Sequence, residues 1–300
     1  MVNKKVLAIC FTQTGQLGEI IDNFTRPLTA AGISVENIRI KPVKDYPFPW
    51  TGERFYDVMP DAVLGVPVPL APFLLKETAY DLIILGYQSW FLSPSIPANS
   101  LLQDPSFKTV LKGTPVVTIT GARNMWLNAF VGIKKLLRDS GADHVGNIAL
   151  VDRHWNPVSY FTIFHWMLGG KKTKLLNIFP LPGVSDADIA GTNKFGETLL
   201  THLLNGEWNG LQDALEKQNA VAYNYHLMIL EAKAGSKYIA WANKVNRSKN
   251  RAGSLVVFKY FLHIALFIGA PVILIVDAIF IKPFSSKKIK ELKQYYLGLK

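Results

Sequence analysis

A run of small polar residues separates the first apolar stretch of the chain, 6–11, from a helical pattern over 17–31. Hydroxyl groups and free backbone N–H groups at the start of a helix attract anions, because the unpaired donors and the helix dipole both favour negative charge. The run has no lysine or arginine and neither the Walker A nor the Rossmann glycine pattern, so it predicts a site for a phosphate monoester. An ordinary helix cap is the alternative. The run consists of Thr12, Gln13, Thr14, Gly15, Gln16 and Leu17.

Two further loops, each at the end of an apolar run, begin with glycine and contain tryptophan. Glycine lets the backbone approach a ligand closely, and the face of a tryptophan can stack on a flat ring. Together with the first loop they indicate a ligand site more strongly than any one loop alone. One loop comprises Gly86, Tyr87, Gln88, Ser89, Trp90 and Phe91, and the other comprises Gly121, Ala122, Arg123, Asn124, Met125 and Trp126.

The elements that must position these loops alternate between strands and helices. Besides the helical pattern at 17–31, a second one has apolar residues on one face and ends near Gly141. Apolar strands separated by helices predict an α/β fold with a doubly wound parallel five-stranded sheet covered on both faces. In such a sheet, ligands bind at the carboxyl ends of the strands. The apolar runs that predict the strands are 6–11, 33–38, 81–86, 115–121 and 145–151.

Two segments interrupt this alternation. Residues 41–72 contain seven prolines together with aromatic side chains, which is typical of a lid or binding loop. Residues 155–168 are strongly apolar and follow the fifth predicted strand directly. They predict either a helix packed in the core or one that faces a substrate or a membrane.

The three loops resemble those of flavodoxin-like FMN proteins. Residues 12–17 match the phosphate loop of that family, while 87–91 and 121–126 match its two isoalloxazine loops. The resemblance covers about 4–152. It implies a flavodoxin-like fold with FMN as the cofactor.

A closer resemblance spans nearly the whole chain. Residues 86–97, 123–126, 152–154 and 182–186 are similar to those of dialkylresorcinol-biosynthesis proteins of flexirubin-type pigment pathways, often labelled condensing enzymes. That label does not fit the residues, because a ketosynthase needs an activated cysteine and the single cysteine, Cys10, lies within the first predicted strand. The resemblance instead implies an FMN-dependent aromatase that oxidises a 2,5-dialkylcyclohexane-1,3-dione to a dialkylresorcinol.

Candidate residues for this reaction follow the fourth and fifth predicted strands. We expect His154 to accept a proton, and Arg123 or Arg153 to stabilise the developing enolate. The alternative is that Asp152 and Arg153 form a surface ion pair while His154 caps a loop. The six histidines show no spacing typical of metal ligands, so no metal site is predicted.

The end of the chain combines its most apolar stretch with all of its excess positive charge. Residues 1–232 hold 20 basic and 20 acidic residues, whereas 233–300 hold 13 basic residues and two acidic ones. The run 260–281 is long enough to span a bilayer, but basic residues flank both its ends, and the positive-inside rule would keep both on one side. A kinked re-entrant or interface-lying hairpin therefore fits better than a single span. A helix packed on its own domain or on a dimer partner is the third alternative.

We expect three parts: a flavodoxin-like FMN-binding domain at 1–155, a helical extension at 156–235 and a membrane-associated segment at 236–300. The N-terminal residues predict a strand rather than a signal peptide, which places the protein in the cytoplasm, peripherally attached to the inner membrane.

The expected partners are a long-chain alkyl substrate and the membrane surface. A ketosynthase, an acyl carrier protein and a second copy of the chain are further candidates. Nucleic acid is not expected, because the basic residues flank an apolar run. Two other functions stay open, a membrane-associated FMN-dependent NAD(P)H:quinone reductase and a non-enzymatic flavodoxin-like adaptor for a ketosynthase.

Overall fold

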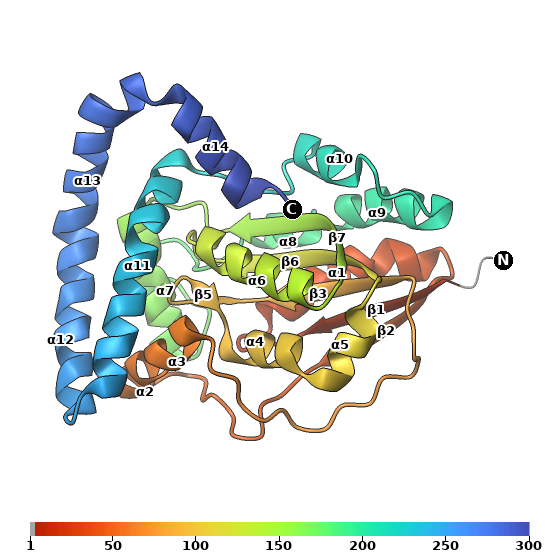
Figure 1. Cartoon of the computed structure of the whole chain (residues 1–300), viewed down its shortest axis with the longest axis horizontal. Coiled ribbons are helices and arrows are strands. Elements are labelled where there is room, and N and C mark those ends of the chain that lie inside the picture. Colours follow the sequence, from red (N-terminus) through yellow and green to blue (C-terminus); the bar gives the residue numbers. More distant parts are fainter. Residues whose placement is uncertain (1–3, 300) are drawn as a thin grey trace.

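Five parallel strands form the central sheet of the computed structural model, which describes residues 4–299 (Figure 1). The strand order β2-β1-β3-β6-β7 is that of the flavodoxin-like doubly wound fold. This order confirms the fold class predicted from the alternation of strands and helices. The strands are β1 (Lys5–Cys10), β2 (Ser34–Arg39), β3 (Leu82–Tyr87), β6 (Pro115–Ala122) and β7 (Asp143–Val151).

Helices cover both faces of the sheet, as a sheet buried on two sides requires. Apolar side chains of α4 (Ile96–Gln103), α5 (Pro105–Leu111) and α6 (Leu127–Asp139) share one core with the sheet. The opposite core is formed by α1 (Gln16–Ala30) with three later helices, so residues after 185 belong to the same folded unit. These helices are α8 (Asp186–Ala190), α9 (Asn193–Asn205) and α10 (Leu211–Lys217).

The glycines that open the two tryptophan loops serve helix–sheet packing. A Cβ on Gly86 would lie 2.5 Å from Ile21 Cδ1, and one on Gly121 would lie 2.8 Å from Ile20 Cδ1. Both isoleucines belong to α1, which packs closely on the sheet because these positions carry no side chain. Packing of α1 is therefore one reason for glycine at both positions, and the expectation that they let the backbone approach a ligand stays a prediction.

The proline-rich segment 41–72 folds into two short helices, α2 (Gly52–Asp57) and α3 (Met59–Leu64). Beside it, the first tryptophan loop forms a two-stranded hairpin from β4 (Ser89–Trp90) and β5 (Ser93–Pro94). The two residues at its turn have φ angles of 50° at Phe91 and 62° at Leu92. Such left-handed angles are those of a type I′ turn, which glycine or asparagine usually occupies.

The apolar C-terminal run lies within one continuous helix, Arg251–Phe284, which is 34 residues long and apolar enough to cross a membrane by length and composition. It comprises α12 (Arg251–Ile264), a π-helical turn η2 (Ala265–Gly269), α13 (Ala270–Val276) and the turns η3 (Asp277–Ile281) and η4 (Lys282–Phe284). The expected hairpin is therefore wrong. Pro271 does not reverse the chain: the π-helical turn η2 precedes it, and Gly269 and Ala270 keep right-handed helical angles.

Both ends of this long helix are tied to the α/β domain, and the helix lies along its side next to α11 (Tyr225–Arg247) (Figure 1). At one end Arg251 Nε donates to Asp57 Oδ1 at 3.0 Å. Beyond the other end, α14 (Ser286–Leu297) returns to α6, where Lys134 Nζ donates to the Gly298 carbonyl at 2.7 Å. The boundary expected between 235 and 236 falls inside α11.

Candidate functional site

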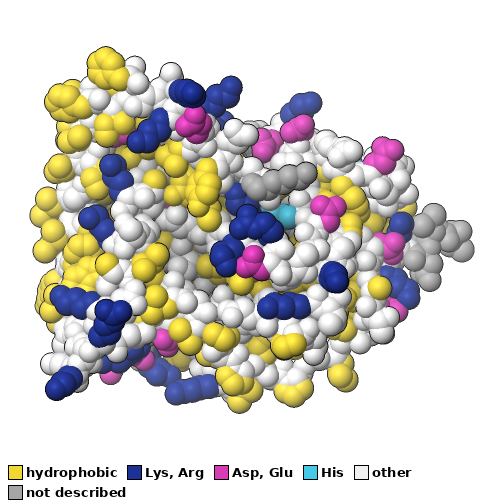
Figure 2. All heavy atoms as spheres, in the orientation of Figure 1, with side chains coloured by type: hydrophobic (Ala, Val, Ile, Leu, Met, Phe, Trp, Pro, Cys, Tyr) yellow, Lys and Arg dark blue, Asp and Glu magenta, His cyan; other side chains and the backbone are white. Residues whose placement is uncertain are grey.

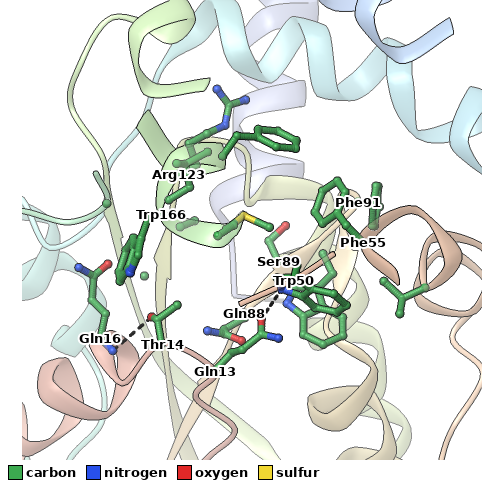
Figure 3. Close-up of a pocket in the computed structure, with 18 residues that line it drawn as sticks. Gln13, Thr14, Gln16, Trp50, Phe55, Gln88, Ser89, Phe91, Arg123 and Trp166 are labelled. Carbon is green, nitrogen blue, oxygen red and sulfur yellow. Dashed lines mark hydrogen bonds between the residues drawn. The ribbon is translucent and has the colours of Figure 1, made fainter. Parts of the chain in front are cut away.

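A cavity of about 230 Å³ lies at the carboxyl ends of β1, β3 and β6 (Figure 3). All three predicted loops reach it, together with side chains from α2 and from α7 (Asn156–Gly169). The sheet order explains this convergence, because these three strands are neighbours. The lining residues are Gln13, Thr14, Gln16, Trp50, Phe55, Val58, Gln88, Ser89, Trp90, Phe91, Gly121, Ala122, Arg123, Ile163, Phe164, Trp166, Met167 and Gly183.

The start of α1 forms the polar end of the cavity. The Gln16 backbone N–H donates to Thr14 Oγ1, and the Gly18 N–H donates to Thr12 Oγ1, both at 3.4 Å. Each hydroxyl accepts from the helix and keeps its own hydrogen available to an anion. Gly15 precedes the helix with a φ of 87°, a left-handed angle that favours glycine. This geometry suits an anion at the end of a 15-residue helix.

A later loop closes this end of the cavity. The Gln16 side chain donates through Nε2 to the Val184 carbonyl at 3.2 Å and accepts from the Val184 N–H at 3.1 Å. Next to it, Gly183 has a φ of 82°, and a Cβ there would lie 2.8 Å from the ring of Trp166. The sequence marked 182–186 only through a resemblance, because nothing local shows that these residues pair with Gln16 so far away in the chain.

Aromatic side chains form the opposite end of the cavity. Trp50 and Trp90 meet edge to face with ring centroids 5.5 Å apart. The Trp50 indole Nε1 donates to Gln13 Oε1 at 2.9 Å, so a residue of the proline-rich segment lies over the polar loop (Figure 3). The turn at Phe91 and Leu92 places an aromatic ring on this wall at a backbone cost of about 1–3 kcal/mol per residue.

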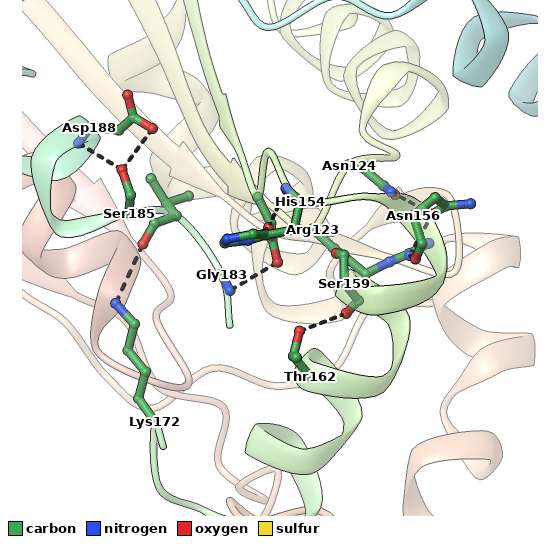
Figure 4. Close-up of polar contacts among 12 residues, drawn as sticks. Arg123, Asn124, His154, Asn156, Ser159, Thr162, Lys172, Gly183, Ser185 and Asp188 are labelled. Carbon is green, nitrogen blue, oxygen red and sulfur yellow. Dashed lines mark hydrogen bonds and ion pairs between the residues drawn. The ribbon is translucent and has the colours of Figure 1, made fainter. Parts of the chain in front are cut away.

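Arg123 is the one charged side chain that lines the cavity among residues 4–299. Its Nη1 donates to Asn156 Oδ1 at 2.8 Å (Figure 4). Its guanidinium lies 6.0 Å from the centroid of the Tyr160 ring. Burial lowers the pKa of Arg123 to about 10, so the side chain stays charged at neutral pH. The site therefore offers a fixed positive charge beside apolar walls.

Three predicted cofactor residues are held in the interior or by other contacts. Trp126 is 1% exposed, and its Nε1 donates to the Ala222 carbonyl at 3.1 Å. This corrects the expectation that Trp126 stacks on a flat ring. Tyr87 is fully buried in the core, and burial raises the pKa of its hydroxyl well above the usual range. Asn124 donates to Asn156 Oδ1 at 2.6 Å.

Three residues of the polar run also lie outside the cavity lining. Leu17 of α1 is buried in the core, Thr12 Oγ1 accepts from the Gly18 N–H, and Gly15 has a left-handed φ before the helix. These residues are Thr12, Gly15 and Leu17.

The residues that follow β7 lie beside the cavity and do not line it. His154 Nδ1 is 2.6 Å from Oδ1 of the buried Asp152, whose Oδ2 accepts from the Gly183 N–H at 3.2 Å (Figure 4). Arg153 has a side chain 67% exposed and pairs with Asp188 at 2.8 Å. The ion pair of Arg153 is therefore with Asp188, and neither His154 nor Arg153 reaches the space where a ring would bind.

No protein-family model and no curated protein matches the chain. Solved structures do resemble it in fold. A flavoprotein from Lactobacillus acidophilus in complex with FMN is 17% identical with a TM-score of 0.40, covering 49% of this chain and 93% of its own. A putative flavoprotein from Bacteroides eggerthii is 19% identical with a TM-score of 0.40, and the match covers 51% of this chain and 91% of the flavoprotein. A flavodoxin from the domain Archaea is 12% identical with a TM-score of 0.37, and the match covers 67% of this chain and 99% of the flavodoxin. The likeness is one of fold.

Proposed function

We propose that this chain binds FMN and works as a flavin-dependent oxidoreductase. One observation carries the proposal: the polar start of α1 and an aromatic wall that includes Trp50 and Trp90 face a single cavity. A phosphate-bearing flat ring needs both an anion site and an aromatic wall. The buried Gln88 Oε1, which lines the cavity and has no hydrogen-bond partner, is available to accept from an N–H group of such a ring.

The residues present fit this group. The hydroxyl of Thr14 and the free N–H groups at the start of α1 would hold the phosphate, and Trp50 and Trp90 would contact the ring. At about 230 Å³ the cavity is smaller than the roughly 300–1,000 Å³ of most ligand sites. Trp50 would therefore have to swing aside, and the hydrogen bond from its indole to Gln13 would break when the ring enters.

For the reaction we propose oxidation of a 2,5-dialkylcyclohexane-1,3-dione to a dialkylresorcinol, as the resemblance to dialkylresorcinol-biosynthesis proteins implies. Bound FMN would supply a two-electron acceptor for a hydride from the substrate ring. A 1,3-dione is acidic, so it can release its proton to solvent and bind as an enolate against Arg123. Removal of a hydride from ring carbon C5, together with loss of a proton from the neighbouring C4 to solvent, would then leave a dienone anion. This anion isomerises to the resorcinolate, which takes up a proton from solvent.

This proposal assigns the enolate contact to Arg123 alone. No histidine, aspartate or glutamate lines the cavity among the described residues. His154 is bound to Asp152 and Arg153 to Asp188, so we assign neither of them to the substrate. Arg123 would orient the substrate oxygen, while the apolar side chains of α7 exclude water from the ring.

A spectrum of the protein purified in mild detergent tests the proposal. Flavin bands that bleach when the dione is added without oxygen, as resorcinol forms, would support the aromatase. Bands that bleach only with NAD(P)H would instead favour the quinone reductase. If no flavin binds even after reconstitution with FMN, the oxidoreductase proposal is wrong and an adaptor role takes its place.

We also propose that the long helix lies in the cytoplasmic surface of the inner membrane. Its outward side carries exposed apolar residues, which Figure 2 shows along the edge formed by α12 and α13. Lysines and arginines lie before it and beyond it, which suits anionic lipid headgroups. Because both ends are tied to one domain, a helix lying flat keeps these contacts, whereas a spanning helix would break one set. Flotation with anionic vesicles at low and high salt tests this attachment.

A further inference from the structure

The helix α7 separates the cavity from the apolar outer surface. On one side it contributes Phe164 and Met167 to the cavity wall. On the other side Phe161 is 50% exposed and contacts the long helix. A helix that is apolar all round is normally buried on every side. Here one of its apolar sides faces the surface that the proposed function places in lipid.

A string of aromatic contacts crosses α7 from the cavity to this surface. Phe55, in the cavity wall, lies 5.2 Å from Phe164, measured between ring centroids, and Phe164 lies 4.7 Å from Tyr160. Tyr160 in turn lies 5.5 Å from Phe267, which stacks on Phe161 at 5.9 Å. The cavity wall and the outer surface are therefore joined by side chains in continuous contact.

The one polar group of this string is already satisfied. Tyr160 lies with its hydroxyl 3.0 Å from His263 Nε2. His263 Nδ1 lies 2.6 Å from the Lys259 carbonyl, which can only accept, so Nδ1 carries the hydrogen and Nε2 accepts from Tyr160. An alkyl chain that slides along the rings would meet no unpaired donor or acceptor there.

We infer that ligands with a long alkyl chain enter the cavity along this string, between α7 and the long helix. Each CH₂ group kept out of water is worth about 0.8 kcal/mol, so an apolar route from lipid avoids a cost that grows with chain length. Phe267 belongs to the π-helical turn η2, where the regular helical hydrogen-bond pattern is already interrupted. A displacement of Phe267 therefore breaks few regular α-helical hydrogen bonds. In the proposed function, FMN occupies the polar end of the cavity and the alkyl ligand approaches from the other end. The route therefore rests on the proposed function.

Cross-linking the outer pair tests the route directly. The variant Phe161→Cys/Phe267→Cys is joined by a short bismaleimide. The matched control is Lys5→Cys/Glu77→Cys, whose native side chains form an ion pair at 2.6 Å between β1 and the segment before β3. Cys10 does not compete, because it is buried in β1 and burial raises its pKa to about 11. The probe is a dodecylresorcinol delivered from phosphatidylcholine vesicles. Its binding is followed by stopped-flow tryptophan fluorescence, since three tryptophans line the cavity.

We expect cross-linking of the outer pair to slow association of the probe by at least about tenfold, with no change in the control and none for unsubstituted resorcinol. Unchanged association would overturn the route, as would the absence of dodecylresorcinol binding in the wild-type protein. Phe267→Ala, which opens the outer end without a cross-link, is expected to speed association, and a slower rate would count against the route. Binding without turnover of the dione would instead mark a failure of the proposed reaction.

Discussion

Asn128 donates two hydrogen bonds to Glu231, one from its backbone and one from its side chain. Glu231 Oε2 accepts from the Asn128 backbone N–H at 2.9 Å, and the Asn128 side-chain amide donates to the Glu231 carbonyl at 2.8 Å. Tyr296 of α14 donates to the same side chain at 3.1 Å. One asparagine at the start of α6 thus holds α11 and α14. The C-terminal helices are built into the α/β domain through this contact.

The buried carboxyl of Glu231 predicts a stability that depends on pH. Burial raises its pKa from the usual 4.5 to about 7, although the N–H groups of Leu127 and Asn128 favour the charged form. The folded state therefore holds a proton that the unfolded state has released between these values, and this contribution to stability falls as pH rises from about 4.5 to 7. Glu231→Gln should remove that fall, measured as the difference in free energy of unfolding between variant and wild type.

Variant and wild type must be compared because His144 changes the free energy of unfolding with pH in the opposite direction. Its burial lowers the pKa from 6.5 to about 4, so its contribution rises with pH in the same range. If the wild type and Glu231→Gln showed parallel pH profiles, Glu231 would not be the group that titrates.

A carboxylate placed in the polar loop should prevent FMN from binding. Thr14→Asp puts negative charge where the phosphate is proposed to lie, and it removes a hydroxyl that could donate to it. We expect no flavin to remain after gel filtration. Thr201→Asp, on the exposed side of α9, is the matched control and should retain the flavin content of the wild type. Normal flavin occupancy in Thr14→Asp would remove the loop from the proposed site.

Removing the charge of Arg123 should slow the dione reaction while leaving FMN bound. Loss of one donor to a developing oxyanion typically costs about 10²–10³ in kcat, and we expect Arg123→Gln to fall in that range. Arg153→Gln should change the rate little, because that side chain is exposed and paired with Asp188. The measurement is the steady-state rate of each variant and of the wild type, at equal flavin content. The reverse order of the two variants would return the enolate contact to Arg153.

A charge on the outward side of the long helix should weaken vesicle binding. Ile268 is among its exposed apolar residues, and Ile268→Glu replaces apolar contact by charge repulsion with anionic lipid. We expect about a tenfold weaker partition onto anionic vesicles, since loss of one buried apolar side chain costs about 1.5 kcal/mol or more. Leu74→Glu, at an exposed apolar residue outside this helix, is the control. Equal loss in both variants would show that net charge alone decides binding.

The sheet and the polar loop could be predicted from sequence because their signals are local. Apolar runs ended within one or two residues of the observed strands, and the loop before α1 directly precedes the helix that it begins. The side chains of the tryptophan loops were harder to place. Trp126 is buried because α6 packs against a segment near Ala222, nearly a hundred residues later, and no local pattern shows this.

The apolar segments could be recognised from the sequence, but which side of each helix faces the protein interior could not. Residues 155–168 predicted a helix packed in the core or one that faces a substrate or a membrane; α7 lines the cavity with Phe164 and exposes Phe161 at the surface. The run around Pro271 suggested a kink, but a single missing N–H was absorbed by a π-helical turn without a reversal of the chain. These outcomes depend on what packs beside each helix.

A helix fixed at both ends cannot roll about its own axis. Asp57 holds Arg251 at one end, and Lys134 holds the chain beyond α14 at the other. In the proposed membrane attachment, every molecule on a flat bilayer would then have the same side towards the lipid and the strand ends at one constant height. A monolayer of the protein on a supported bilayer would be uniformly oriented, and its substrate would need to search in only two dimensions.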